Sequence, residues 1–175
     1  MNHRQNRKES IAMKFTITHA YDTDTETLFK VVTDPSYLVK KFEATGAKNI
    51  QILECGPDGS GFVIRSQMDI PAKPPELLKK FIKAMNAVVA EDTWQSFDKE
   101  LKTGVFEIDI KGMPITMTGF LTLRPTKKGC EYIIETEARC SIPIVGGKIL
   151  SIVERDTRDN QKVDYEFTRS YLKNL

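Results

Sequence analysis

The C-terminal segment of the chain reads PIVGGKILSIVERDTRDNQKVDYEFTRSYLKNL, residues 143–175. After the double glycine at 146–147 it contains neither proline nor glycine, which predicts one continuous helix over about residues 148–173. At roughly 1.5 Å per residue, this helix is on the order of 40 Å long, enough to cross a small domain. We expect the two glycines to turn the chain from strand to helix with dihedral angles that other residues rarely adopt.

Apolar side chains of this helix follow one line along its surface. At about 100° per residue, seven residues lie within roughly 60° of that line: Val145, Ile149, Ile152, Val153, Val163, Phe167 and Tyr171. The same projection places Tyr165 on the opposite face. Asp156 and Asn160 interrupt the apolar line at its centre. Either this polar pair is structural, through hydrogen bonds to each other or to a neighbour such as His19 or Tyr132, or it orients the polar head of a ligand.

Strand patterns dominate the chain before this helix. Apolar and polar residues alternate over seven segments, at about residues 14–21, 48–55, 62–70, 87–98, 103–111, 114–124 and 130–144. Turn residues such as Gly56-Pro-Asp-Gly59 join strands as hairpins, which implies an antiparallel sheet. The last strand has the small residues Thr136, Ala138 and Cys140 on its inner face, which leaves room either for a cavity or for close contact with a helix.

Two short helices follow the first strand. Thr23-Asp-Thr-Glu26 has the spacing of a capping box, and Asp34-Pro35 ends the first helix and caps a second one that closes at Gly46. A further amphipathic helix is expected at about residues 75–85, either as a lid or as part of the core. The predicted fold is therefore α+β: a curved antiparallel sheet of about seven strands that grips a long C-terminal helix, with two short helices after strand 1.

Length and composition restrict the class of protein. A chain of 175 residues with 40% hydrophobic and 29% charged residues is typical of one soluble globular domain. The net charge is +2, and Arg4, Arg7 and Lys8 against Glu9 account for all of it. A balanced domain disfavours a nucleic-acid partner, which needs a basic face. Residues 1–12 are expected to be a disordered basic leader, and residues 13–175 a single domain.

Several kinds of site have little support in the sequence. No apolar run approaches the ~18 residues needed to span a bilayer, and the N-terminus lacks the hydrophobic region of a secretory signal. Cys55, Cys130 and Cys140 have no metal-binding spacing and are expected to be reduced thiols of a cytoplasmic protein. His3 and His19 are the only histidines, too few for a zinc site or histidine-based catalysis. We therefore expect no metal and no cofactor, and the sequence carries no signal for an oligomeric state.

Three motifs give the chain a resemblance to a known superfamily. They are Thr27-Leu-Phe-Lys-Val-Val-Thr-Asp34-Pro35, then Gly112-Met-Pro114 with Gly119, and Pro143-Ile-Val-Gly-Gly-Lys148 leading into the terminal helix. With them, the order of elements is similar to the helix-grip fold of the START, birch-pollen-allergen-like superfamily (SRPBCC). The motifs resemble a bacterial branch of it that is known only as a domain of unknown function.

The resemblance covers about residues 13–173 and implies a cavity between sheet and terminal helix that holds an apolar or amphipathic ligand. Members of the superfamily include carriers, enzymes and proteins that dock on chaperones, and they share no catalytic motif that could be transferred. We therefore expect a protein that binds or transports a small hydrophobic, lipid-like ligand. Two alternatives remain open: a cyclase- or hydrolase-type enzyme that uses the same cavity, with Asp156 as acid or base, and a protein-interaction module.

Candidate ligand-binding residues come from the faces that should meet in this cavity. His19 points with the aromatic residues of the first strand, where it is either a hydrogen-bonded core histidine or part of the ligand site. No residue is assigned a catalytic role. The full candidate set is Asp156, Asn160, Ile149, Ile152, Val153, Val163, Phe167, His19, Trp94, Tyr132, Thr136, Ala138 and Cys140.

Overall fold

The computed structural model describes residues 10–95 and 100–175. Seven antiparallel strands form one sheet in the order β1-β7-β6-β5-β4-β3-β2. The strands are β1 (Ile11–Tyr21), β2 (Lys48–Asp58), β3 (Gly61–Pro71), β4 (Met85–Trp94), β5 (Lys102–Ile110), β6 (Ile115–Thr126) and β7 (Gly129–Cys140). The helices are α1 (Thr25–Val32), α2 (Pro35–Ala44) and α3 (Gly146–Leu172). This confirms the predicted fold of a curved sheet that grips a long terminal helix.

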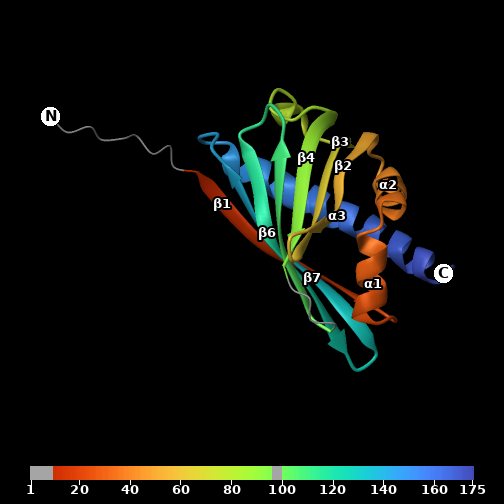
Figure 1. Cartoon of the computed structure of the whole chain (residues 1–175). Coiled ribbons are helices and arrows are strands. Elements are labelled where there is room, and N and C mark those ends of the chain that lie inside the picture. Colours follow the sequence, from red (N-terminus) through yellow and green to blue (C-terminus); the bar gives the residue numbers. More distant parts are fainter. Residues whose placement is uncertain (1–9, 96–99) are drawn as a thin grey trace.

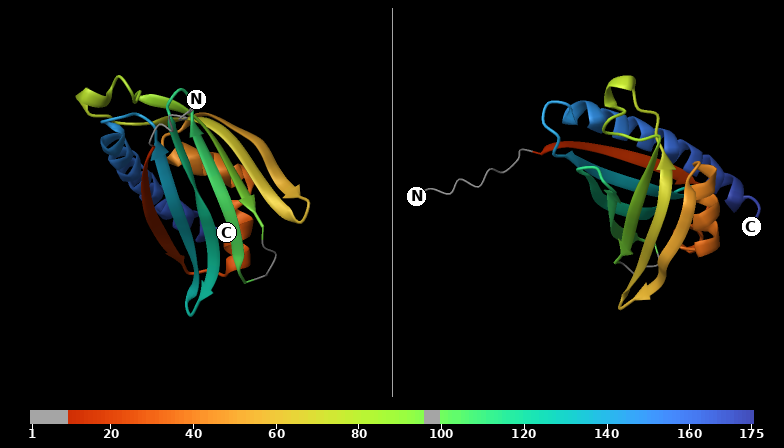
Figure 2. Two further views of the ribbon diagram at one scale, coloured as in Figure 1. Left: turned by 90° about the vertical axis from the view of Figure 1, so that its left-hand side faces the viewer. Right: turned by 90° about the horizontal axis from the view of Figure 1, so that it is seen from above.

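The arrangement encloses the space between sheet and helices. α3 lies along one face of the curved sheet, and α1 and α2 lie beside its C-terminal end (Figures 1 and 2). Strands β2 to β7 follow one another as hairpins, whereas β1 pairs with β7, for example at Ile17 and Ile134. Consecutive strands β1 and β2 are thus the two edges of the sheet, and α1 and α2 connect them.

Carboxylates start both short helices. Asp24 accepts a hydrogen bond from the backbone N–H of Thr27 at 2.8 Å, one residue after the Thr23 that the capping-box pattern favours. Asp34 accepts one from the backbone N–H of Tyr37 at 2.8 Å. These bonds satisfy helix N–H groups that have no partner within the helix. They also hold the pKa of each carboxyl below its usual value; at Asp24 the backbone bond from Thr27 is the main cause, and at Asp34 the hydrogen bond from Ser36.

The prediction of a helix over residues 75–85 is wrong in its extent. Only a single 3-10 turn forms, at Glu76–Leu78, and the rest of the segment is irregular. β3 and β4 pair as far as Pro71 and Met85, which leaves only residues 72–84 to connect the two strands. That connection is too short for a three-turn helix and the two turns that it would need. Within it, the Leu78 side chain is buried and that of Leu77 is exposed.

The junction between β7 and α3 also differs from expectation. β7 ends at Cys140 instead of continuing to about 144, and the left-handed residue that follows is Ile144, with φ of 69°. Gly146 and Gly147 have no positive φ, so the dihedral reason for the double glycine is wrong. Gly146 instead lies close to β1 and β7, where an added Cβ would lie 3.3 Å from Ile11 Cδ1, which a small shift of that side chain would relieve, and 3.6 Å from Cys140 Sγ.

β1 begins two residues earlier than the expected domain start at Met13. Ile11 and Ala12 pair with Cys140 and Arg139 of β7, so these two residues belong to the sheet and not to a leader. Of the rest of the expected leader, residues 1–9 lie outside the described part of the chain, and Ser10 is exposed and precedes β1.

The face of α3 that meets the sheet changes along the helix. Ile149, Leu150 and Ile152 are buried in its first half, whereas Thr168 is the buried residue of its last turns. At about 100° per residue, Ile152 and Val163 lie within about 20° of each other around the helix axis, yet Ile152 is buried and Val163 is exposed. A straight helix that crosses a twisted sheet presents different sides to it at its two ends. A single apolar line is therefore the wrong description of α3. None of the helices in the described ranges has the length and apolar character to cross a bilayer.

Candidate functional site

An interior cavity of about 240 Å³ lies between the sheet, α2 and α3. It is larger than the two other concave spaces between the sheet and α3, and ligand sites are usually concave. Most of its wall is apolar and comes from the inner faces of strands β3 to β7, including Ile64, Met68, Val88, Ile108, Leu121 and Ile134. Its remaining wall is polar and comes from four different elements: Lys41, Asp92, Tyr132, Asn160, Gln161 and Asp164.

Strand β4 places one carboxyl group in this wall. Val88, Ala90 and Asp92 alternate along the strand and all line the cavity, because every second residue of a strand faces the same side. Asp92 pairs across the sheet with Ile64 on β3 and Phe106 on β5, so its neighbours in the sheet are apolar. Burial raises the pKa of Asp92 to about 6, a shift that nearby Lys41 opposes.

An ion pair joins the two helices across the cavity. Lys41 Nζ of α2 lies 3.6 Å from a carboxylate oxygen of Asp164 of α3, and each side chain is only 19% exposed. Burial lowers the pKa of Lys41, but the charge of Asp164, together with Tyr37 and Asp92, raises it above its usual value. Lys41 is therefore a fixed ammonium whose charge is balanced by Asp164.

Beyond the polar wall lies a second cavity of about 20 Å³, the size of one water molecule. Trp94 lines it, and the buried indole Nε1 makes no hydrogen bond with the described residues. Two hydrogen bonds cross it: Tyr37 Oη to Thr168 Oγ1 at 2.6 Å, and His19 Nε2 to Gln161 Oε1 at 3.2 Å.

The aromatic groups around this small cavity are neutral. Burial raises the pKa of Tyr132 well above its usual value and that of Tyr37 to about 12. Burial lowers the pKa of His19, against the opposing effects of Gln161 and Asp164, so the ring is an uncharged imidazole near neutral pH. Of the residues that line the small cavity, only Lys41, Asp92 and Asp164 therefore carry a charge.

The structure brings some of the candidate residues together. Tyr132, Thr136 and Asn160 line the main cavity, and His19 and Trp94 line the small one. His19 is also stacked on Tyr165, with ring centroids 4.7 Å apart.

Other candidates lie in a side pocket of about 70 Å³ at the other end of α3, where Ile152, Val153 and Asp156 line the wall together with Asn160. Asp156 pairs with the guanidinium of its neighbour Arg155 at 2.7 Å and does not line the main cavity. Of the predicted polar pair, only Asn160 therefore faces the central space.

The remaining candidates lie outside these three cavities. Ile149, Ala138 and Cys140 are fully buried where the start of α3 packs on β7, so this part of the small-residue track provides close helix contact. Phe167 packs against Tyr37 and Tyr171. Val163, expected to face the sheet, is 43% exposed, because the buried side of α3 has turned away from it.

Sequence reasoning missed Lys41, Asp92 and Asp164 as residues of the cavity wall. The alternation of β4 was the available signal, because Asp92 is in phase with Val88 and Trp94. No comparable signal marked Lys41 or Asp164, which lie on helices whose orientation only the folded chain defines. Among the described residues, no group of three or more histidine, cysteine, aspartate or glutamate side chains forms a metal site.

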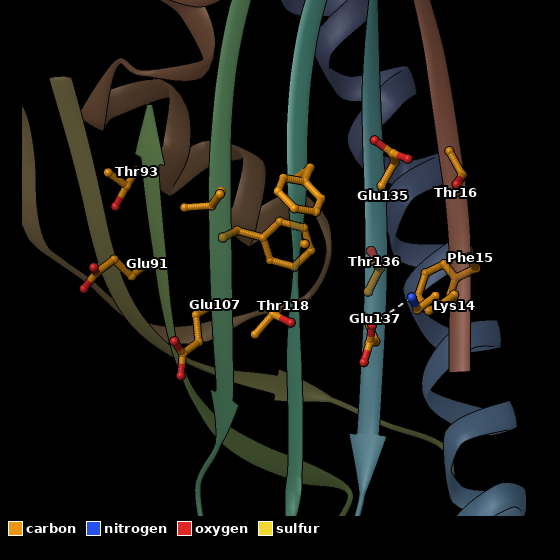
Figure 3. Close-up of a pocket in the computed structure, with 14 residues that line it drawn as sticks. Lys14, Phe15, Thr16, Glu91, Thr93, Glu107, Thr118, Glu135, Thr136 and Glu137 are labelled. Atoms are coloured by element: carbon orange, nitrogen blue, oxygen red, sulfur yellow. Dashed lines mark ion pairs between the residues drawn. The ribbon is translucent and has the colours of Figure 1, made fainter. Parts of the chain in front are cut away.

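A larger groove of about 630 Å³ lies on the outer face of the sheet, with α3 behind the strands (Figure 3). Four glutamates contribute to it: Glu91, Glu107, Glu135 and Glu137. Glu91 pairs with Arg65 and Glu137 with Lys14. The groove is lined mainly by the outward side chains of the strands and, unlike the interior cavity, is not enclosed by helices, so we take the interior cavity as the candidate site.

The curved sheet and the long helix that it grips are the helix-grip fold. Known structures agree at the level of the fold. Ara h 8.0201 is 12% identical, with a TM-score of 0.59 over 94% of this chain and 98% of that one. Norcoclaurine synthase from Thalictrum flavum is 15% identical, with a TM-score of 0.55 over 95% and 88%. A protein of unknown function from Staphylococcus aureus, SA2116, is 11% identical, with a TM-score of 0.58 over 94% and 98%.

At the level of sequence, residues 16–172 match the model of a family described as a protein of unknown function, DUF2505. The chain belongs to this family. A comparison with curated proteins found no match.

Proposed function

We propose that this protein binds a small apolar or amphipathic molecule in the interior cavity. The observation that carries the proposal is the cavity itself, about 240 Å³ of space with apolar walls and one polar end. Its volume is slightly below the range of roughly 300–1,000 Å³ for sites of drug-sized ligands, so the ligand is small. The helix-grip fold agrees with this function, because it holds sheet and helix apart around an enclosed space.

Filling the cavity tests the proposal. Ala90 lines the cavity on β4, whereas Ala87 of the same strand is exposed on the other face. We expect Ala90→Phe to abolish the binding of octan-1-ol, followed by the fluorescence of Trp94, the only tryptophan of the chain. Ala87→Phe is the matched control and keeps the binding. Equal binding by both variants, with both folded, contradicts a ligand site in this cavity.

Native mass spectrometry of freshly purified protein supplies a second measurement. A bound molecule that is lost from Ala90→Phe and kept by Ala87→Phe supports the proposal and yields the ligand for identification. Octan-1-ol binding by the fluorescence assay remains decisive if the protein is purified empty.

One observation favours an enzyme as a second candidate. Asp92 has its pKa raised to about 6 by burial and shares the cavity with Lys41 and Tyr132. A carboxyl group with a pKa near neutral pH is suited to move a proton to or from a bound molecule. Incubating the extracted ligand with the protein and with Asp92→Asn distinguishes the two functions, because an enzyme changes the mass or isomeric form of the molecule and a carrier returns it unaltered.

A further inference from the structure

The polar end of the interior cavity holds one more carboxyl group than it holds cations. Lys41 is the cation, and its ammonium pairs with Asp164 at 3.6 Å. Asp92 makes neither a hydrogen bond nor an ion pair of 4 Å or less with the described residues, although it lies in the cavity wall. Asp92 is half-buried, and a carboxylate that is partly removed from water without a partner is destabilising, so a ligand that pairs with it gains from the contact.

No other described cation faces Asp92 from the surrounding elements. β1 contributes Tyr21 and the neutral His19, α2 contributes Tyr37, and β7 contributes Tyr132. α3 contributes only uncharged partners besides Asp164, namely Gln161 and Thr168. The adjacent charge on β4 is Glu91, which is also negative and points to the outer face.

We propose that this end of the cavity recognises a ligand whose head is a protonated amine, with Asp92 as the partner of the ammonium group. The inference rests on the proposed function and names the class of ligand. A monocation is the charge that balances two carboxylates and one lysine. An anionic head would instead meet the unpaired Asp92, while the one available cation, Lys41, is already paired with Asp164.

The shape of the site agrees with an amphipathic amine. Asp92 lies between Ile64 and Phe106 in the sheet, and the wall continues through Ala90 and Val88 along β4. An apolar body that extends along these residues keeps its head beside the carboxylate. Low local polarity strengthens an ionic hydrogen bond at that point.

Three probes with the same alkyl chain and different heads test the inference: octylammonium, octan-1-ol and octanoate. Trp94 lines the small cavity together with Asp92, so its fluorescence reports on this end directly. At about pH 7.5 we expect octylammonium to bind about ten-fold more tightly than octan-1-ol, and octanoate to bind most weakly. Lowering the pH to about 5 should weaken octylammonium binding about ten-fold through protonation of Asp92, and leave octan-1-ol unchanged.

Asp92→Asn should reduce octylammonium affinity to that of octan-1-ol and remove the pH dependence. Asp109→Asn is the matched control: Asp109 is a carboxylate on the neighbouring strand β5 that pairs with Lys111 outside the cavity. If Asp92→Asn fails to fold, the inference is tested on the unaltered protein, by the order of the three binding affinities and by the pH dependence of octylammonium binding.

The outcomes separate this inference from the proposed function. Tightest binding of octanoate, or equal binding of all three probes, overturns the amine inference and leaves a ligand-binding cavity in place. Absence of binding by all three probes overturns both.

Discussion

Asp92 is the side chain whose ionisation we expect to be coupled most directly to folding. Its usual pKa is 3.8, and burial raises the pKa to about 6 in the folded protein. The folded state therefore binds a proton more tightly than the unfolded state. The contribution of Asp92 to the free energy of unfolding therefore falls as the pH rises from about 4 to about 6, and above about pH 6 it stays at its lowest value.

Replacing Asp92 with Asn should remove this loss. We expect Asp92→Asn to raise the free energy of unfolding by about 2 kcal/mol at about pH 7.5 and to change it little at about pH 4. Urea denaturation at the two pH values measures the effect, and Asp109→Asn is the exposed control. An equal gain at both pH values would show that the ionisation of Asp92 is not the cause.

Tyr165 packs against β1, although the sequence pattern placed it on the face of α3 opposite the apolar line. Its ring stacks on His19 and meets Tyr21 edge-on, and its hydroxyl donates a hydrogen bond to the carbonyl oxygen of Ala20 at 2.8 Å. We expect Tyr165→Ala to lower the free energy of unfolding by about 3 kcal/mol, and Tyr165→Phe by about 1 kcal/mol, since only the hydrogen bond is lost.

Val163→Ala is the control for these variants, because Val163 lies on the same helix and is 43% exposed. Its effect in the same denaturation experiment should stay below about 0.5 kcal/mol. A larger loss from Val163→Ala than from Tyr165→Ala would restore the single apolar line that the sequence pattern suggested.

At the scale of elements, β6 depends on a glycine at its centre. An added Cβ at Gly119 would lie 1.8 Å from the backbone oxygen of Glu135 on β7 and 2.6 Å from Cε1 of Phe106 on β5. A backbone oxygen in a sheet cannot move away without breaking the pairing of two strands. We expect Gly119→Ala to lower the free energy of unfolding by more than about 3 kcal/mol, measured by urea or thermal denaturation.

Gly56 provides the matched control in β2. An added Cβ there meets no atom within 4 Å, and its φ is not positive. Gly56→Ala should change the free energy of unfolding by less than about 0.5 kcal/mol. If the two variants were equally stable, the close contact at Gly119 would not constrain β6.

The elements themselves could be predicted from the sequence because they are local. Alternating strands joined by turn residues, two capped helices and a long helix without glycine or proline each have a signal within a few residues. The connection at 72–84 could not be predicted in the same way, since the pairing of Pro71 with Met85 limits its length. The side of α3 that is buried depends on the twist of the sheet, and no periodicity within the helix contains that information.

At the scale of the whole molecule, the polar end of the cavity could not be predicted. Lys41, Asp92 and Asp164 come from α2, β4 and α3, and each taken alone is an ordinary charged residue. They become a site only because the sheet curves and brings the two helices over β4. The resemblance to helix-grip proteins did imply a cavity between sheet and terminal helix, and Tyr132, Thr136 and Asn160 were among the residues expected to line it.

The N-terminal limit of the domain is a further property of the whole chain. We propose that residues 1–9 contribute nothing to stability, so a chain that starts at Ser10 should melt at the same temperature as the full chain. Starting instead at Met13 removes Ile11 and Ala12 from their pairing with β7. The melting temperature should then fall by about 2–4 °C, as expected for a loss of about 1 kcal/mol in a domain of this size. Equal melting of the two truncated chains would place the domain start at Met13.

The pairing of β1 with β7 also has a consequence for the time course of protein synthesis. β1 is the first strand to leave the ribosome, but its neighbour in the sheet is the last strand, β7. Roughly 110 residues separate the two strands, which at about 5–20 residues per second corresponds to about 5–20 s of translation. During that interval the backbone of β1 lacks the strand with which it pairs, and its apolar residues Phe15 and Ile17 lack the cover of α3, which is made later still. We therefore expect β1 to be open to chaperone binding until β7 has been made.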